Sequence, residues 1–229
     1  MSQVSCAIFD LDGTLLDTEP FYAQVNQEVI NEFGNGLAYD WARRRLFMGK
    51  KAALTNDLFR ELFAIRLSVE EVTRVREERL ERLFRHSPAL PGALELLRAI
   101  KARGIPVALA TSSTRRLVDL KLADHPEMRS LLDHLVCGDD AVVQRSKPAP
   151  DIFIRAAALC GVQDMARSVI FEDSALGVEA AVAAGAVVVA VPDAHLRDDA
   201  VFARADFLLP DLRAVRPEML RARTNTATQ

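Results

Sequence analysis

Short apolar runs alternate with helical spacing along most of the chain. Five runs rich in Val, Ile, Leu and Ala have the length of strands and lack the strict apolar/polar alternation of a half-exposed sheet. They cover residues 4–9, 105–110, 134–137, 168–171 and 186–191. Helical patterns separate most of them, so the sequence predicts a parallel α/β sheet.

Two of the predicted helices have clear start and stop signals. Pro91 and Gly92 open a segment with apolar residues at helical spacing, and Gly104 ends it. Ser174 is a suitable N-cap for another helix, which ends at Gly185 immediately before the last strand run. Such short connections between helices and strands indicate compact βα units.

Residues 17–90 differ from the rest because they contain no comparable strand run and show helical spacing throughout. One predicted amphipathic helix has its apolar face at Leu54, Leu58, Leu62 and Ile65. A second covers residues 69–84, where apolar positions recur among dense Glu and Arg. We therefore expect a Rossmann-like doubly wound parallel sheet from residues 1–16 and 91–229, with an α-helical cap domain inserted at residues 17–90.

Composition favours a folded protein with a small ligand. Of the 229 residues 50% are hydrophobic and 27% charged, and the net charge of -3 provides no broad positive field for nucleic acid or anionic lipid. No stretch approaches the roughly 18 uninterrupted apolar residues of a membrane span. We expect a cytoplasmic monomer that binds a small metabolite and neither nucleic acid nor membrane.

The three cysteines Cys6, Cys137 and Cys160 lack CxxC spacing. Neither a disulfide framework nor a zinc site is therefore indicated. Cys6 and Cys137 lie in apolar strand-like runs, so we expect them to be buried free thiols.

Candidate chemistry begins where the first strand run ends, in the segment IFDLDGTLLDTE. Asp10 and Asp12 are two residues apart, so in extended geometry both carboxylates leave the same face. Gly13 permits a sharp turn after them. Thr14 adds a hydroxyl that can orient a carboxylate or bind an oxyanion.

Other polar side chains follow later strand runs. They are Thr111 and Ser112 in ALATSS, Lys147 in KPAPD, and Glu172 and Asp173 in FEDS. Ligands of an open parallel sheet bind beyond the carboxyl ends of its strands, so we expect these groups to converge near Asp10. The two hydroxyls and the ammonium group are suited to binding phosphate oxygens.

A carboxylate that attacks a phosphomonoester brings two anions together, so the site must supply positive charge. Mg²⁺ prefers hard oxygen ligands, which Asp10, a backbone carbonyl near Asp12, and the pair Glu172 and Asp173 could provide. Lys147 is a compact point charge that can offset negative charge on nucleophile and phosphoryl group together. The sequence thus predicts a magnesium-dependent phosphate site.

Taken in order, the motifs DLDGT, TSS, KPAPD and FEDS resemble the four signatures of the haloacid dehalogenase superfamily of phosphatases, over nearly the whole chain. The resemblance implies that Asp10 is a nucleophile that forms an aspartyl-phosphate. It implies that Asp12 protonates the leaving oxygen and then activates the hydrolytic water. A single carboxyl group can serve in both steps, because a covalent intermediate splits the transfer in two.

The helical insert is similar to the mobile cap of the β-phosphoglucomutase-like subgroup, and Lys50 and Lys51 in FMGKKA are the cap residues expected to contact substrate. The strings MGKKA, GIPVALATSS and GDDAVVQRSKPAPDIF resemble the eukaryotic pseudouridine-5'-phosphatase branch more closely. This resemblance implies a substrate such as pseudouridine 5'-phosphate, or a related nucleotide or sugar phosphate.

Two other functions are compatible with the same residues. A phosphomutase related to β-phosphoglucomutase would form the same aspartyl-phosphate but return the phosphate to a sugar, and would need a cap group that positions a sugar hydroxyl. A catalytically silent binding protein of the same fold would tolerate the change Asp10→Asn without loss of function.

Overall fold

The computed structural model describes residues 2–47 and 52–223, with the side chains of 52–55 excepted. Within these residues a single sheet has six parallel strands in the order β3-β2-β1-β4-β5-β6. The strands are β1 (Cys6–Phe9), β2 (Val107–Ala110), β3 (His134–Val136), β4 (Ser168–Glu172), β5 (Val187–Ala190) and β6 (Phe207–Leu208). The predicted doubly wound α/β sheet is confirmed.

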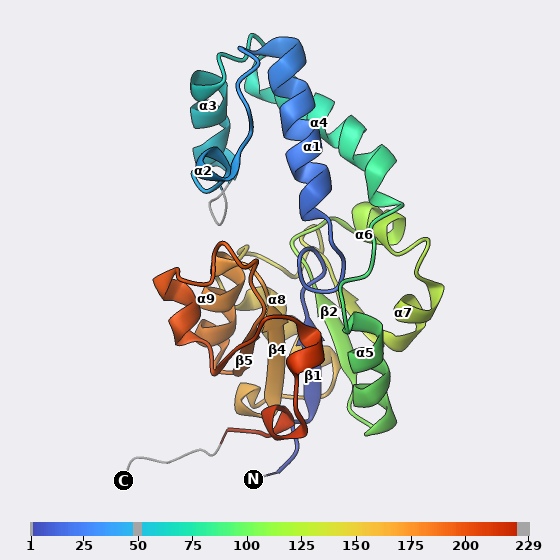
Figure 1. Cartoon of the computed structure of the whole chain (residues 1–229). Coiled ribbons are helices and arrows are strands. Elements are labelled where there is room, and N and C mark those ends of the chain that lie inside the picture. Colours follow the sequence, from blue (N-terminus) through green and yellow to red (C-terminus); the bar gives the residue numbers. More distant parts are fainter. Residues whose placement is uncertain (1, 48–51, 224–229) are drawn as a thin grey trace. The chain divides into compact units, whose positions relative to one another are not determined.

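Helices cover both faces of this sheet (Figure 1). Helices α5 (Ala93–Ala102), α6 (Arg115–Lys121) and α7 (Pro126–Leu131) lie on one face, and α8 (Asp151–Leu159) and α9 (Ala175–Ala184) on the other. Short 3-10 helices lie at Met165–Arg167, Ala200–Arg204, Leu212–Ala214 and Pro217–Leu220. Both faces are buried, which explains why the strand runs are apolar without alternation.

Strand β1 shows how the two faces are filled. Phe9 packs in the cluster on the α5 side of the sheet, and Ile8 packs in the cluster on the α8 side. Phe9 also stacks on Phe171 of β4, with ring centroids 4.4 Å apart and an angle of 7° between the planes. The Asp10 amide then donates to the Phe171 carbonyl at 3.0 Å. These contacts fix the end of β1 beside the end of β4, where the strand order reverses.

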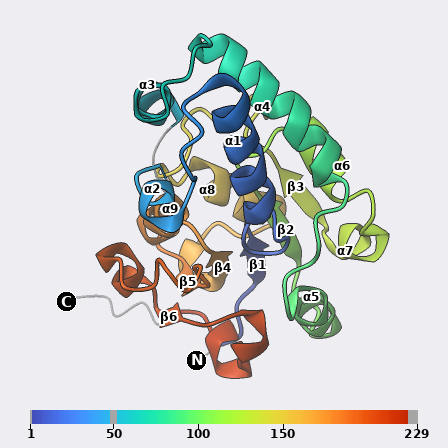
Figure 2. The same ribbon diagram turned by 45° about the horizontal axis from the view of Figure 1, so that its top comes forward.

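The observed strands are shorter than the predicted runs for local reasons. The Val4 amide donates to the Leu220 carbonyl, which is not part of the sheet, so β1 begins after this residue. Pro106 has no N–H to donate, and β2 begins at the next residue. Strand β6 was not predicted, because two residues carry no readable apolar pattern; it lies at the sheet edge beside β5 (Figure 2).

The contacts divide the chain into two compact units. The core unit is Met1–Asp17 with Pro88–Gln229, and the helical unit is Thr18–Ser87. The chain leaves the core unit after Asp17 and returns to it at Pro88. These two residues lie side by side, because the Asp17 amide donates to the Pro88 carbonyl at 2.9 Å. The sequence predicts this insert at residues 17–90.

The helical unit consists of α1 (Glu19–Phe33), α2 (Trp41–Arg44), α3 (Ala52–Leu62) and α4 (Val69–Phe84). Helix α4 has the bounds that its apolar spacing predicts. It begins with a capping box: Ser68 accepts from the Glu71 amide, and the Glu71 carboxylate accepts from the Ser68 amide.

The predicted apolar face of α3 was wrong at Leu58, whose side chain is exposed at 37%. The buried positions lie one residue further on, at Phe59 and Phe63, which pack with Tyr39 and Phe47 in an aromatic cluster. Two phenylalanines bury more apolar surface than leucines would, so they determine the helix rotation. Phe63 directly follows the last residue of α3, and Ile65 is also buried beyond the end of the helix.

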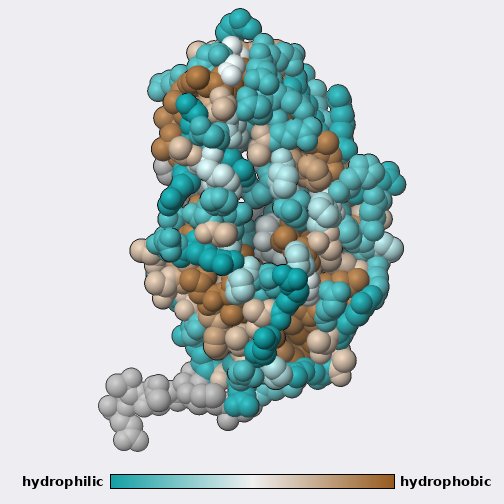
Figure 3. All heavy atoms as spheres, in the orientation of Figure 1, coloured by the Kyte–Doolittle hydropathy of each residue, from teal (hydrophilic) through white to brown (hydrophobic). Residues whose placement is uncertain are grey.

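Figure 3 shows hydrophilic residues interspersed with smaller apolar patches on the face in view. Among the described residues no helix is both long enough and apolar enough to cross a membrane.

The aromatic cluster gives a direct test of the helical unit. Phe63→Ala removes a fully buried ring and should lower the free energy of unfolding by about 3–5 kcal/mol. Leu58→Ala is the matched control and should change it by less than about 1 kcal/mol, since that side chain is exposed. Urea unfolding of both variants measures the difference. Equal losses would contradict the observed rotation of α3.

Candidate active site

Three of the predicted site residues meet at the carboxyl edge of the sheet. The Lys147 ammonium donates to Asp10 Oδ1 and to Glu172 Oε1, each at 2.6 Å, and to the Ala110 carbonyl at 3.1 Å. Asp10 and Lys147 are 6% exposed and Glu172 is fully buried. One lysine therefore joins the ends of β1, β2 and β4 and holds the side chain of Asp10.

Hydrogen bonds from the start of α9 hold the Glu172 carboxylate in place. Its Oε2 accepts from the amides of Asp173 and Ser174 and from the Ser174 hydroxyl, at 3.0–3.1 Å. A Cβ at Gly177, in the first turn of α9, would lie 1.9 Å from the Glu172 carboxyl, so this helix position requires glycine. Both oxygens of Glu172 already accept hydrogen bonds from protein donors; its direct contact with a metal stays a prediction.

Asp173 faces the turn that follows β1. Its Oδ1 accepts from the Thr14 hydroxyl at 3.1 Å. Gly13 adopts a φ of 80°, and a Cβ there would lie 2.2 Å from Asp173 Oδ2. Glycine thus allows both the left-handed turn and the close approach of Asp173, which brings this carboxylate to the loop carrying Asp12.

The site carries more negative charge than its lysine balances. Burial raises the pKa of Asp10 to about 7, with Glu172 and Asp12 adding to the rise and Lys147 opposing it. Burial, Glu172 and Asp10 also raise the pKa of Asp173 well above its usual range. Burial lowers the pKa of Lys147, but Asp10 and Glu172 outweigh burial and raise it overall. Three carboxylates share one ammonium group, and a hard divalent cation such as Mg²⁺ fits this oxygen-only donor set.

The side chain of Asp12 has a different set of partners. The ammonium group of Lys121 donates to its Oδ1 at 2.6 Å and its Oδ2 at 2.8 Å, and the Ser113 hydroxyl donates to Oδ2 at 2.8 Å. Asp10 and Asp12 follow the same strand, as predicted, yet each carboxylate is paired with its own lysine. Sequence reasoning missed Lys121 and Ser113. The available signal was that Lys121 follows buried Val118 by three residues, which places a lysine on the inner face of α6.

The two hydroxyl residues predicted to bind phosphate differ in their surroundings. Thr111 is 1% exposed, and its Oγ1 accepts from the Ser113 amide at 3.1 Å, so it shapes the turn after β2. Ser112 is exposed, and its side chain makes no hydrogen bond with the part of the chain described. Lys50 and Lys51 lie outside the described residues.

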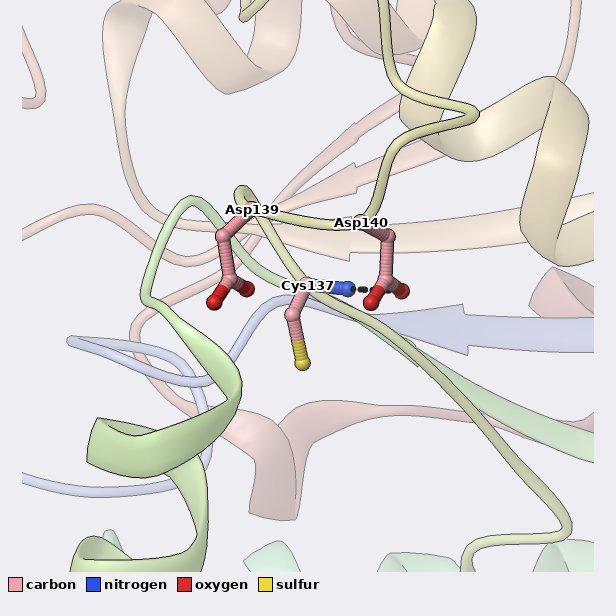
Figure 4. A group of neighbouring side chains, drawn as sticks. All are labelled: Cys137, Asp139 and Asp140. Atoms are coloured by element: carbon pink, nitrogen blue, oxygen red, sulfur yellow. Dashed lines mark hydrogen bonds between the residues drawn. The ribbon is translucent and has the colours of Figure 1, made fainter.

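A second group of possible ligands, Cys137, Asp139 and Asp140, lies in the loop after β3 (Figure 4). Asp140 accepts from the Cys137 amide at 2.9 Å and from the Arg115 guanidinium, and Asp139 accepts from the Arg115 amide at 2.9 Å. Burial raises the pKa of the Cys137 thiol to about 11. The group therefore ties this loop to α6. Cys137, like Cys6, is a buried free thiol, as predicted.

The sequence of the chain also matches a known protein family. The model of the haloacid dehalogenase-like hydrolases matches residues 4–185, which contain all the strand-end groups described above. The chain belongs to the haloacid dehalogenase-like hydrolase family. The resemblance seen in the sequence motifs is confirmed, and so is the prediction of an enzyme.

Individual relatives extend the likeness over almost the full chain. The chain is 39% identical to (DL)-glycerol-3-phosphatase 1, mitochondrial, of Arabidopsis thaliana, over 94% of this chain and 72% of that one. It is 37% identical to a Drosophila melanogaster protein named "Probable pseudouridine-5'-phosphatase", over 95% and 94% of the two chains. The beta-phosphoglucomutase of Clostridium difficile has a TM-score of 0.72 at 21% identity, over 95% and 97%, which shows a shared fold.

The raised pKa values of Asp10 and Asp173 predict how stability depends on pH without metal. The folded state binds more protons than the unfolded chain between about pH 4 and pH 7, so the free energy of unfolding should fall as pH rises through this range. Mg²⁺ should restore stability most strongly above pH 7. Thermal unfolding in chelator and in Mg²⁺ measures both effects.

Asp173→Asn should flatten the pH dependence of the metal-free protein's stability and weaken stabilisation by Mg²⁺, because it removes one of the three clustered carboxylates. The control Asp198→Asn changes an exposed carboxylate and should leave both unchanged. A metal-free protein that gains stability as pH rises from 4 to 7 would contradict the charge imbalance.

Proposed function

We propose that this protein is a magnesium-dependent phosphomonoester hydrolase that acts on a small phosphorylated metabolite through an aspartyl-phosphate at Asp10. The observation that carries the proposal is the buried contact of Lys147 with both Asp10 and Glu172, at 2.6 Å each. It fixes a carboxylate at the strand edge beside a permanent positive charge. Such a group is equipped to attack an electrophile that is itself anionic.

In the first step an oxygen of Asp10 attacks phosphorus and the ester bond to the leaving oxygen breaks. Lys147 offsets the charge shared by the nucleophile and the phosphoryl group. Ser112 and the turn shaped by Thr111 bind phosphate oxygens. Asp12 gives its proton to the leaving alcohol.

In the second step Asp12, now a carboxylate, removes a proton from water, and the water oxygen attacks phosphorus. The bond from phosphorus to Asp10 breaks, which releases inorganic phosphate and restores the free carboxylate. Asp12 recovers its proton in this step, so one side chain serves as acid and then as base.

Magnesium would be held by Asp10, the backbone carbonyl of Asp12 and Asp173, with Glu172 as the further predicted ligand. When bound, it supplies positive charge that reduces repulsion between the carboxylate and the phosphate oxygens. The excess of buried carboxylates over Lys147 supports this assignment.

The names of the relatives support a small phosphate ester as substrate, with glycerol 3-phosphate and pseudouridine 5'-phosphate as the two leading candidates. We further propose that the helical unit acts as a cap that selects the substrate, with Lys50 and Lys51 as contacts to it. The cytoplasmic location and the monomeric state stay predictions.

Inorganic phosphate release with Mg²⁺ from pseudouridine 5'-phosphate, uridine 5'-phosphate, glycerol 3-phosphate and β-glucose 1-phosphate tests the substrate class. We expect release from at least one of the first three, with a preference that identifies the ligand. If β-glucose 1-phosphate is instead converted to another sugar phosphate without release, the protein is a mutase and the hydrolase proposal is wrong.

Asp10→Asn should abolish phosphate release, by at least about 10³-fold, because an amide is not a nucleophile at phosphorus. Chelation of Mg²⁺ should also stop release, and restored Mg²⁺ should return it. The control Asp198→Asn should keep full activity. Phosphate release that survives Asp10→Asn would exclude the covalent route.

A further inference from the structure

Lys121 is an unusual residue for the last turn of a short helix. It is fully buried, whereas lysine on a helix normally keeps its ammonium group in water. Its Nζ contacts both oxygens of Asp12, at 2.6 and 2.8 Å, and the Ser113 hydroxyl at 2.9 Å. Burial of a cation is costly unless good contacts compensate it, and an apolar side chain would fill this position of α6 at lower cost.

The contacts form a closed triangle. Ser113 donates to the same carboxylate oxygen that Lys121 reaches at 2.8 Å, and the Ser113 amide donates to Thr111. The carboxylate of Asp12 is thereby fixed in both position and rotation, since two donors hold one of its oxygens and one donor holds the other. A carboxylate that directly precedes a glycine turn would otherwise have several accessible rotamers.

We propose that Lys121, together with Ser113, is the positioning residue for Asp12, and that it sets the orientation from which Asp12 exchanges protons with the leaving group and with water. The inference rests on the proposed function, because it assigns a partner to the acid and base of that reaction. The site then has two lysines with separate tasks: Lys147 serves the nucleophile Asp10, and Lys121 serves Asp12.

Loss of a residue that positions Asp12 should lower kcat/KM only for substrates whose leaving group needs a proton. A general destabilisation of the fold should lower kcat/KM for all substrates alike. Expulsion of an alkoxide needs a proton from Asp12, whereas p-nitrophenolate leaves without one. In a covalent mechanism kcat/KM reports only the steps up to departure of the leaving group. Comparison of kcat/KM for glycerol 3-phosphate and p-nitrophenyl phosphate therefore isolates the proton transfer to the leaving oxygen.

Lys121→Met keeps the length and burial of the side chain and removes its charge. We expect kcat/KM for glycerol 3-phosphate to fall about 10- to 100-fold, and kcat/KM for p-nitrophenyl phosphate to change by less than about three-fold. If the protein proves selective for another alkyl phosphate, that substrate takes the place of glycerol 3-phosphate. Lys101→Met is the control, because the pair of Lys101 with Asp133 is at the surface and should affect neither substrate. Equal losses for both substrates would overturn the proposal.

The double variant Lys121→Met with Asp12→Asn tests whether Lys121 affects kcat/KM only through Asp12. If Lys121 acts through Asp12, the double variant has the same kcat/KM as Asp12→Asn alone. A further loss of the same size as in the single Lys121→Met variant would contradict the proposal. Asp12→Asn without effect on the wild-type background would instead contradict the proposed function itself, so the two failures are distinguishable.

Circular dichroism and thermal unfolding establish that each variant is folded before its kinetics are compared. Should Lys121→Met fail to fold, Ser113→Ala tests the proposal instead. This variant removes the hydroxyl that donates to Asp12 and accepts from Lys121, without removing a charge. It should lower kcat/KM for the alkyl phosphate by more than for p-nitrophenyl phosphate, in the same direction as the lysine change. An equal effect on the two substrates would overturn the proposal.

Discussion

The contact of Lys147 with Asp10 and Glu172 is the interaction on which the rest of the site depends. Three buried charges at the edge of a parallel sheet would destabilise the fold if any of them lacked a partner. Lys147 prevents this, and the ring of Phe153 from α8 lies 4.9 Å from its ammonium group. The same contact that makes the strand ends compatible with burial also presents Asp10 beside positive charge. The contacts of Lys147 with Asp10 and Glu172 therefore stabilise the fold and also place the proposed nucleophile beside a positive charge.

Contacts between β1, β4 and α9 hold Asp10, Glu172 and Lys147 in this arrangement. The stacked rings of Phe9 and Phe171 align β1 with β4, which places Asp10 next to Glu172. Gly177 makes room for Glu172 beside the first turn of α9, and the Glu172 carboxylate also accepts from the amide of Ser174, the residue that caps this helix. A one-residue slip of either strand would separate the charges and move the side chains of that strand to the opposite face of the sheet. The carboxylates of Asp10, Glu172 and Asp173 outnumber the ammonium group of Lys147, and burial together with this excess raises the pKa values of Asp10 and Asp173.

Much of this could be predicted from the sequence, because the sheet and the strand-end motifs depend on local patterns. Apolar runs that end in Asp10, Thr111 and Glu172 identify both the strands and the edge at which they meet. The rest depends on tertiary contacts that no local pattern encodes. Lys121 lies more than a hundred positions from Asp12, and its inward direction is set by how α6 packs. Likewise, Phe59 rather than Leu58 faces inward because of aromatic neighbours from other segments.

The central claim is that phosphate passes through a covalent bond to Asp10. Rapid mixing with substrate, acid quenching and borohydride reduction would convert an aspartyl-phosphate at that position into homoserine, which peptide mass spectrometry can locate. The mechanism predicts homoserine at position 10 in the wild-type protein in the presence of substrate and Mg²⁺, and none without substrate. Homoserine at another aspartate, or full turnover with no modified residue at any quench time, would contradict it.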